Sequence, residues 1–290
     1  MPLVVNSSIL IATRSMHEDL YALSSALIDL LAEKVRLCGT QAHGYLCKLL
    51  DYEADWVVNI DEDAFVWDTG KILGLVDFMG GEGFACCGCP DGGVVWHRFH
   101  NPLVPSPFFN VFHLKRIKAA YPGAQQADNV RYDESLKRFT APFVRGALGK
   151  DCAYDMYEPY SPFFLWILRT GTGMLYPDAD SWAENRHATI PKDRLGEPFL
   201  IHTWFARDWG SPPGRERILK AHAYCREQNA KQSEVKDARG AATLTGDRAA
   251  GRSGENCAPM DAHTPGFPGE EHTWLKHWTP RFSIRSSLMG

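Results

Sequence analysis

One short segment constrains the fold of this chain more than any other: residues 54–65, which read ADWVVNIDEDAF. Its apolar part, WVVNI at 56–60, has the length and β-branched content of a buried strand. The strand ends abruptly in three acids, Asp61, Glu62 and Asp63. In extended backbone, residues two apart point to the same side. We therefore expect Asp61 and Asp63 to aim their carboxylates at one point just past the strand.

Two carboxylates at one point repel each other unless a cation joins them. Hard oxygen ligands favour Mg²⁺ or Mn²⁺, and such ions usually take one or two carboxylates together with phosphate oxygens. Open α/β sheets bind their ligands outside the carboxyl ends of their strands. The segment therefore predicts a divalent metal and a phosphate-bearing ligand at the end of a central strand.

Composition bounds the class of protein. The 290 residues, 44% of them hydrophobic, allow one large domain or two small ones. A net charge of −4 gives no electrostatic case for binding nucleic acid. Eight cysteines are spread through the chain without a disulfide framework, which is typical of reduced thiols in a cytoplasmic protein. No signal peptide and no apolar stretch of ~20 residues that could span a membrane is evident.

The pattern of apolar runs predicts strands alternating with helices, and hence a layered α/β fold. A loop rich in Pro and Gly at 90–93 predicts a hairpin that joins two of the strands. Residues 124–150 are polar and predict a long loop or lid, whereas the aromatic stretch 160–168 is expected to be buried. The expected strands are 8–13, 34–38, 56–60, 84–89, 94–99, 108–112 and 199–205, and the main expected helices are 18–33, 40–52, 68–79 (closed by Gly80-Gly81) and 212–230.

The composition changes near the end of the chain. Residues 231–290 contain only seven residues from Leu, Ile, Val and Phe. Such a stretch cannot bury enough apolar surface to offset its ordering entropy. We therefore expect one folded domain over 1–230 and a mostly disordered tail over 231–290.

The strand that ends in Asp61-Glu62-Asp63 resembles the DxD signature of GT-A-type glycosyltransferases. The resemblance covers roughly residues 3–230. It implies a Rossmann-like fold with a mixed central sheet flanked by helices. It also implies a Mn²⁺ or Mg²⁺ ion held against the diphosphate of a nucleotide-sugar, with Asp61 and Asp63 as ligands. In many members a late His completes the metal shell, and His202 follows the apolar run 199–201, where it suits that role.

The same resemblance implies a set of substrate-binding residues. The loop after the first strand lies against the nucleotide base and ribose in that family. A late arginine is suited to pairing bidentately with a diphosphate, and a carboxylate on a turn is suited to a sugar hydroxyl. The expected substrate-binding residues are Thr13, Arg14, Ser15, Glu62, Asp91, Gly92, Trp204 and Arg207.

The implied reaction moves a sugar from a nucleoside diphosphate sugar, with a UDP-sugar favoured, to a hydroxyl of a glycan or glycoconjugate. The metal acts as a Lewis acid on the departing diphosphate. An inverting enzyme also needs a base, for which the candidates in order are Glu158, Asp155 and Asp91. Burial beside aromatic residues would raise a carboxylate pKa towards a useful value. A retaining enzyme needs no base in that place.

Three other functions fit parts of the pattern. Haloacid-dehalogenase-type phosphatases also use Asp-x-Asp after a strand, but their strand opens the domain, and Phe65 stands where they carry Thr or Val. A degenerate transferase fold would serve as a non-catalytic scaffold that binds carbohydrate or nucleotide. Nucleotidyltransferases share the metal carboxylates but carry a Gly-rich loop after the first strand, and residues 11–15 contain no glycine.

Overall fold

The computed structural model of the chain describes residues 8–39, 44–92, 94–95, 97–145 and 151–246. The chain divides into two units, Met1–Glu234 and Val235–Gly290, and the architecture below is that of the first. The strands are β1 (Ile9–Arg14), β2 (Glu33–Leu37), β3 (Trp56–Ile60), β4 (Ala64–Val66), β5 (Cys86–Pro90), β6 (Pro105–His113), β7 (Met174–Leu175), β8 (Ala179–Trp182), β9 (Asn185–Pro191) and β10 (Leu200–His202). The α-helices are α1 (Glu18–Ala26), α2 (Gly44–Leu49), α3 (Thr69–Glu82), α4 (Leu114–Ala120), α5 (Ala124–Asp128), α6 (Ser161–Arg169) and α7 (Pro212–Gly246), and three short 3₁₀ helices are η1 (Glu134–Phe139), η2 (Pro142–Arg145) and η3 (Ala206–Gly210).

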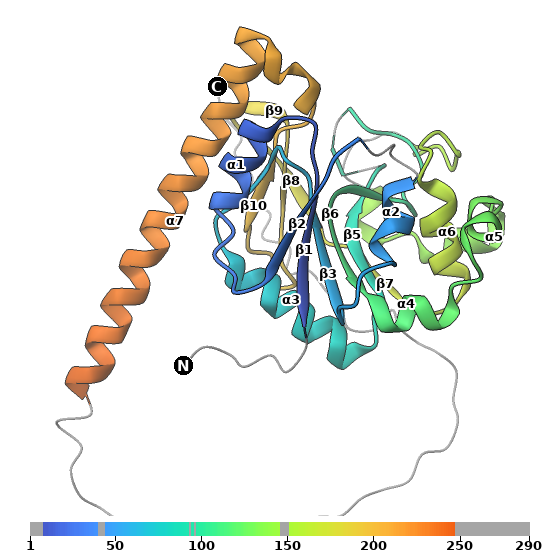
Figure 1. The fold of residues 1–290 in the computed structure, drawn as a ribbon, viewed down its shortest axis with the longest axis horizontal. Coiled ribbons are helices and arrows are strands. Elements are labelled where there is room, and N and C mark those ends of the chain that lie inside the picture. Colours follow the sequence, from blue (N-terminus) through green and yellow to red (C-terminus); the bar gives the residue numbers. More distant parts are fainter. Residues whose placement is uncertain (1–7, 40–43, 93, 96, 146–150, 247–290) are drawn as a thin grey trace, which may run out of the picture. The chain divides into compact units, whose positions relative to one another are not determined.

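A six-stranded sheet in the order β2-β1-β3-β6-β5-β7 forms the centre of the fold (Figure 1). Strand β1 runs parallel to both β2 and β3, whereas β6 is antiparallel to β3 and β5. The expected α/β fold with a mixed central sheet flanked by helices is therefore confirmed.

Alternation along the strands sorts the core into two layers. Leu10 and Ala12 of β1 pack with α2, α4 and α6 on one face, while Ile11 between them packs with α3 on the other. Val57 and Val58 of β3 divide in the same way. Both faces of the sheet are thus covered at its centre, which explains why β1 and β3 are apolar along most of their length. Burying each such side chain contributes about 1.5–3 kcal/mol.

A second sheet, in the order β4-β10-β9-β8, is antiparallel throughout. It packs against Leu20 of α1 and against Ile218 and Ala221 of α7. Strand β10 lies within the stretch 199–205, where a strand was expected, but it spans only Leu200–His202. Strands β8 and β9 were not expected, because polar residues interrupt both of them.

Two expected helices end at other residues. Helix α1 stops at Ala26 rather than near Glu33, and Lys34 Nζ donates to the carbonyls of Ser25 and Ile28 at this end, at 2.9 and 2.8 Å. Helix α2 spans Gly44–Leu49, shorter at its end than the expected 40–52, and residues 40–43 lie outside the described part.

The expected hairpin between 84–89 and 94–99 is wrong. Strand β5 pairs with β6 and β7 instead, and the described residues of 94–99 form no strand. The buried Asp91 carboxylate binds Arg98, and the Asp91 N–H donates to the Val104 carbonyl at 2.8 Å, so the chain after β5 folds into a loop. Gly92 lies so close to this loop that a Cβ there would be 2.0 Å from the His100 oxygen.

The other expectations have mixed outcomes. The polar stretch 124–150 holds the short helices α5, η1 and η2, with 146–150 outside the described residues, and the aromatic stretch forms the buried α6. Helix α7 runs past residue 230 to Gly246, so the first part of the expected tail is helical, and residues 247–290 lie outside the described part. Among the described helices, none is long and apolar enough to cross a membrane.

Helix α3 continues through Gly80 and Gly81, where its end was expected, and closes at Gly83 with φ 85°. A left-handed residue at this position is a common helix stop, and glycine adopts it without strain.

This difference is testable with two alanine substitutions. Gly81→Ala lies inside the helix with no atom within 4 Å of its added Cβ, and we expect it to stabilise the protein by ~0.5–1 kcal/mol. Gly83→Ala is expected to destabilise it by ~1 kcal/mol, because alanine is strained at positive φ. Urea unfolding measures both. The opposite order of the two variants would mean that the helix ends at Gly81.

Candidate metal and substrate site

The acids after β3 lie in a tight turn and not in extended strand. The Asp61 N–H donates to the Phe108 carbonyl at 2.9 Å, and the Asp61 carbonyl accepts from the Ala64 N–H at 3.0 Å. The chain thus reverses between β3 and β4. The expected reason for the convergence of the two carboxylates, alternation in a strand, is therefore wrong, and the turn takes its place.

The second sheet brings His202 to this turn. Residues 200–202 of β10 pair antiparallel with β4 so that His202 stands opposite Ala64, next to Asp63. His202 Nε2 lies 3.2 Å from Asp63 Oδ1. Ligand atoms of Asp61, Asp63 and His202 all lie within 4.8 Å of one another, and no other His, Cys, Asp and Glu side chains in the described residues form such a group. We call these three residues the metal group.

The donor set of the metal group fits a divalent cation. Asp61 Oδ1 and His202 Nδ1 are buried and have no hydrogen-bond partner in the described part of the chain. Burial raises the pKa of Asp61 to about 6, although the Arg14 guanidinium, 4.0 Å away, opposes the shift. A bound cation would stabilise the ionised form of such a carboxylate, which burial disfavours and which has an oxygen without a hydrogen-bond partner.

Asp63 is the more firmly held of the two acids. The Thr203 hydroxyl donates to Asp63 Oδ2 at 3.0 Å, and the Thr203 N–H donates to the Asp63 carbonyl at 3.0 Å. Burial alone would raise the pKa of Asp63, but the charge and hydrogen bond of His202, together with Thr203, hold it below its usual value. Asp63 therefore stays ionised and fixed in place. Sequence reasoning gave Thr203 no role, although it directly follows His202.

Glu62, between the two acids, points in another direction. Its carboxylate accepts hydrogen bonds from the Ser15 hydroxyl at 2.8 Å and from the N–H groups of Met16 and His17 at 3.0 and 2.9 Å. It therefore ties the loop after β1 to the turn. Glu62 and Ser15 were both expected to bind substrate, but they are buried and hydrogen-bonded to each other.

Of the residues expected to bind the nucleotide, Arg14 reaches the metal group. In the parallel pairing of β1 with β3, Ala12 lies beside Asn59. Two residues further along each strand, Arg14 and Asp61 therefore lie side by side at the strand ends. The Arg14 guanidinium also lies over the Tyr45 ring, 5.1 Å from its centroid. Thr13 is only 3% exposed within β1.

Aromatic rings enclose the imidazole of His202. The Phe108 ring stacks on it at 4.3 Å between centroids, and the Trp204 ring lies 4.7 Å away. Trp204, expected to bind substrate, therefore borders the metal group. The Arg207 guanidinium lies over the exposed Phe205 ring at 5.4 Å, and no described contact joins it to Asp61, Asp63 or His202.

The candidate bases lie in two loops that Arg98 joins. Arg98 donates to both oxygens of Asp91 at 2.7 Å and also binds Glu158. Its guanidinium lies 5.3 Å from the centroid of the Trp204 ring, which links this cluster to the metal group. Burial raises the pKa of Asp91 to about 6 against the pull of Arg98. The sequence pattern did not predict that Arg98 would bind both carboxylates.

The third candidate base, Asp155, has a different partner. Its Oδ2 lies 3.0 Å from His100 Nδ1, and its side chain is 38% exposed. The His100 ring stacks on Tyr157 at 3.9 Å between centroids. Asp155 is thus the candidate carboxylate that solvent or an acceptor reaches most readily.

No protein-family model matches the sequence, and no curated protein matches it. Among solved structures, a mannosyltransferase from Pyrobaculum calidifontis, in complex with GDP-Man and Mn²⁺, is 14% identical with a TM-score of 0.32, over 85% of this chain and 76% of that one. A glycosyltransferase involved in glycosylation of the major capsid of PBCV-1 is 10% identical with a TM-score of 0.28, over 55% and 89%. A protein from STIV is 16% identical with a TM-score of 0.29, over 40% and 69%.

The role of Glu62 is testable by a near-isosteric change. Glu62→Gln replaces an acceptor oxygen with an amide that faces hydrogen-bond donors, so we expect a loss of ~1–3 kcal/mol in the free energy of unfolding. Chemical denaturation measures the loss. Unchanged stability would show that the three hydrogen bonds to Glu62 do not hold the loop.

The role of Arg98 is testable in the same assay. Arg98→Ala leaves the Asp91 and Glu158 carboxylates unpaired, and we expect it to cost ~3 kcal/mol or more. Arg215→Ala is a matched control, because its pair with Asp19, at 3.4 Å, is exposed to solvent and contributes little to stability. Equal losses in the two variants would contradict a special role for Arg98.

Proposed function

We propose that the protein is a metal-dependent glycosyltransferase that moves a sugar from a nucleoside diphosphate sugar to an acceptor hydroxyl. The observation that carries this proposal is the metal group itself. A buried carboxylate, a partly buried one and a buried imidazole converge just past the carboxyl end of β3, and Asp61 Oδ1 and His202 Nδ1 have no hydrogen-bond partner in the described part of the chain. Mn²⁺ or Mg²⁺ suits these donors and would leave coordination positions for diphosphate oxygens.

Each residue of the site has a role in this proposal. Asp61, Asp63 and His202 would hold the ion, which would supply Lewis-acid stabilisation of the charge on the departing diphosphate. Arg14 lies at the same edge of the sheet, 4.0 Å from Asp61, and in this proposal its guanidinium donates to a phosphate oxygen of the donor. Trp204 and the loops that Arg98 joins border the metal group on the side where the sugars would lie.

Among the candidate bases, the contacts favour Asp155. A base must accept the acceptor proton while its carboxylate is free. Asp91 and Glu158 both bind the Arg98 guanidinium, whereas Asp155 is more exposed and has only the His100 ring and the Tyr157 N–H as partners. The order proposed from the sequence, Glu158 before Asp155, is therefore reversed in this proposal.

Calorimetry tests the proposal directly. The protein is titrated with UDP, GDP, dTDP and CMP, and with their sugar conjugates, with and without Mn²⁺. We expect one nucleotide to bind only with Mn²⁺, and Asp61→Asn/Asp63→Asn to lose that binding while the exposed control Asp77→Asn keeps it. No binding of any nucleotide by folded protein would overturn the proposal. Binding without release of the nucleoside diphosphate from its sugar conjugate would favour the scaffold alternative.

A further inference from the structure

The backbone directly after the metal group is strained. Trp204 and Phe205 have φ values of 59° and 60°, and no other residue except glycine has a positive φ in the described part of the chain. Side chains with a Cβ seldom adopt this left-handed conformation. Two in succession persist only where surrounding contacts hold them, and such strain gathers at functional sites.

The contact that holds this turn comes from α7. Arg217 donates through Nη1 to the Thr203 carbonyl and through Nη2 to the Trp204 carbonyl, the latter at 2.9 Å. The fixed fork of a guanidinium can satisfy two carbonyls at once, which the point charge of a lysine cannot do in the same geometry. The Trp204 indole N–H donates to the Thr189 hydroxyl at 2.8 Å and fixes the turn from β9.

The Thr203–Phe205 turn also positions Asp63. Thr203, whose carbonyl Arg217 holds, is fully buried and makes the two hydrogen bonds described above to the side chain and backbone of Asp63. Two links therefore lead from α7 to the Asp63 carboxylate, Arg217 to Thr203 and Thr203 to Asp63, and a third joins Asp63 to His202. Groups that orient metal ligands in this way commonly change metal affinity 10–100-fold when they are mutated.

We propose that Arg217 is a positioning residue of the metal group, which clamps the strained Thr203–Phe205 turn so that Asp63 and His202 face one ion. The inference rests on the proposed function, because it needs the group to bind a divalent cation. It assigns to α7, which supplies none of the three ligands, control over the affinity of the site.

The charge of Arg217 and its positioning role predict opposite effects of Arg217→Ala on Mn²⁺ affinity, so one measurement distinguishes them. Arg217 carries a positive charge that repels a cation. If charge were its whole influence, Arg217→Ala would tighten Mn²⁺ binding. If it positions Asp63, Arg217→Ala weakens binding although a repulsive charge has gone.

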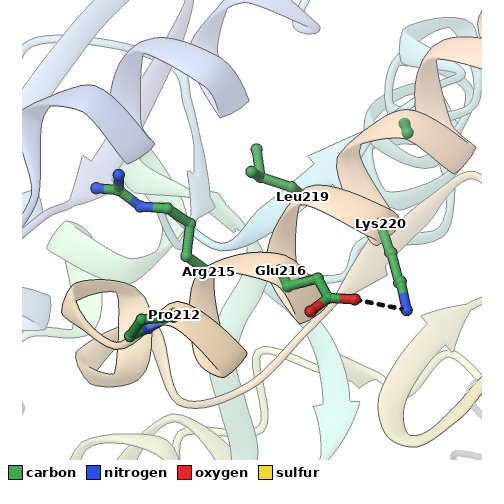
Figure 2. A pocket seen from close by; sticks show the side chains of 6 residues that line it. Pro212, Arg215, Glu216, Leu219 and Lys220 are labelled. Carbon is green, nitrogen blue, oxygen red and sulfur yellow. Dashed lines mark ion pairs between the residues drawn. The ribbon is translucent and has the colours of Figure 1, made fainter.

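The experiment titrates the full chain with Mn²⁺ alone and follows free Mn²⁺ by its electron paramagnetic resonance signal. We expect both Arg217→Ala and Arg217→Lys to raise the Kd by ~10-fold or more. Arg215, labelled in Figure 2, carries the same charge on the same helix but pairs with Asp19. No described contact joins it to the turn, so Arg215→Ala should stay within about twofold of the wild type. Circular dichroism confirms that each variant is folded. If Arg217→Ala does not fold, the lysine variant decides.

A second variant tests the strain itself. Glycine adopts φ 60° at no steric cost, so Phe205→Gly in the Arg217→Ala background should recover part of the lost Mn²⁺ affinity. Failure to recover any would overturn the clamping of a strained turn.

Three further outcomes would overturn the proposal. The first is an Arg217→Ala variant that binds Mn²⁺ as tightly as the wild type or more tightly, because the turn would then not need the clamp. The second is an Arg217→Lys variant that behaves as the wild type, because the guanidinium fork on two carbonyls would then be unnecessary. In both cases the wild type still binds Mn²⁺, and the proposed function stands. A wild type that binds no Mn²⁺ would overturn the metal-dependent function, and this inference with it.

Discussion

The antiparallel pairing of β4 with β10 is the interaction on which the site depends. It places His202 opposite Ala64 and so beside Asp63, and it joins the second sheet to the end of β3. Side chains alternate along a strand, so a slip of one residue would turn His202 away from the acids. The pairing is secured from outside by apolar packing, since Phe65 and Ile201 of the two strands are fully buried against α1 and α7. The geometry of the metal group is therefore a product of core packing.

The turn between β3 and β4 places its three consecutive acids, Asp61, Glu62 and Asp63, in three different environments. Asp61 faces Arg14 and keeps an unused oxygen, Glu62 is satisfied by three donors of the loop after β1, and Asp63 is fixed between His202 and Thr203. A buried carboxylate is tolerated only when it is paired or hydrogen-bonded. The turn therefore sends each charge to a separate partner. What distinguishes Asp61 is that its set of partners is incomplete.

The sequence predicted the parts of the fold in which local pattern and tertiary packing agree. Strand β3 is apolar on both faces, and the alternation of strands and helices identified the layered α/β class. It could not predict β8 and β9, whose polar residues hide their pairing, or the loop after β5, which a buried Asp91–Arg98 pair organises instead of a turn. Asp61, Asp63 and His202 were predicted as a group, but the turn that brings the two acids together was not. Thr203, Arg98 and Arg217 were missed because their roles arise from contacts between distant segments.

The separation of the site's parts along the chain has a consequence for how the protein matures. Asp63 and its partner Thr203 are 140 positions apart, and the clamp from Arg217 follows later still. Closing such long loops carries an entropic cost before any contact rewards it, so contacts of this kind form late in folding. A ribosome that adds ~5–20 residues per second would expose the acids of β3 for several seconds before β10 and α7 emerge. During that interval the carboxylates lie in water, and Asp61, Asp63 and His202 come together only when synthesis of the folded domain is almost complete.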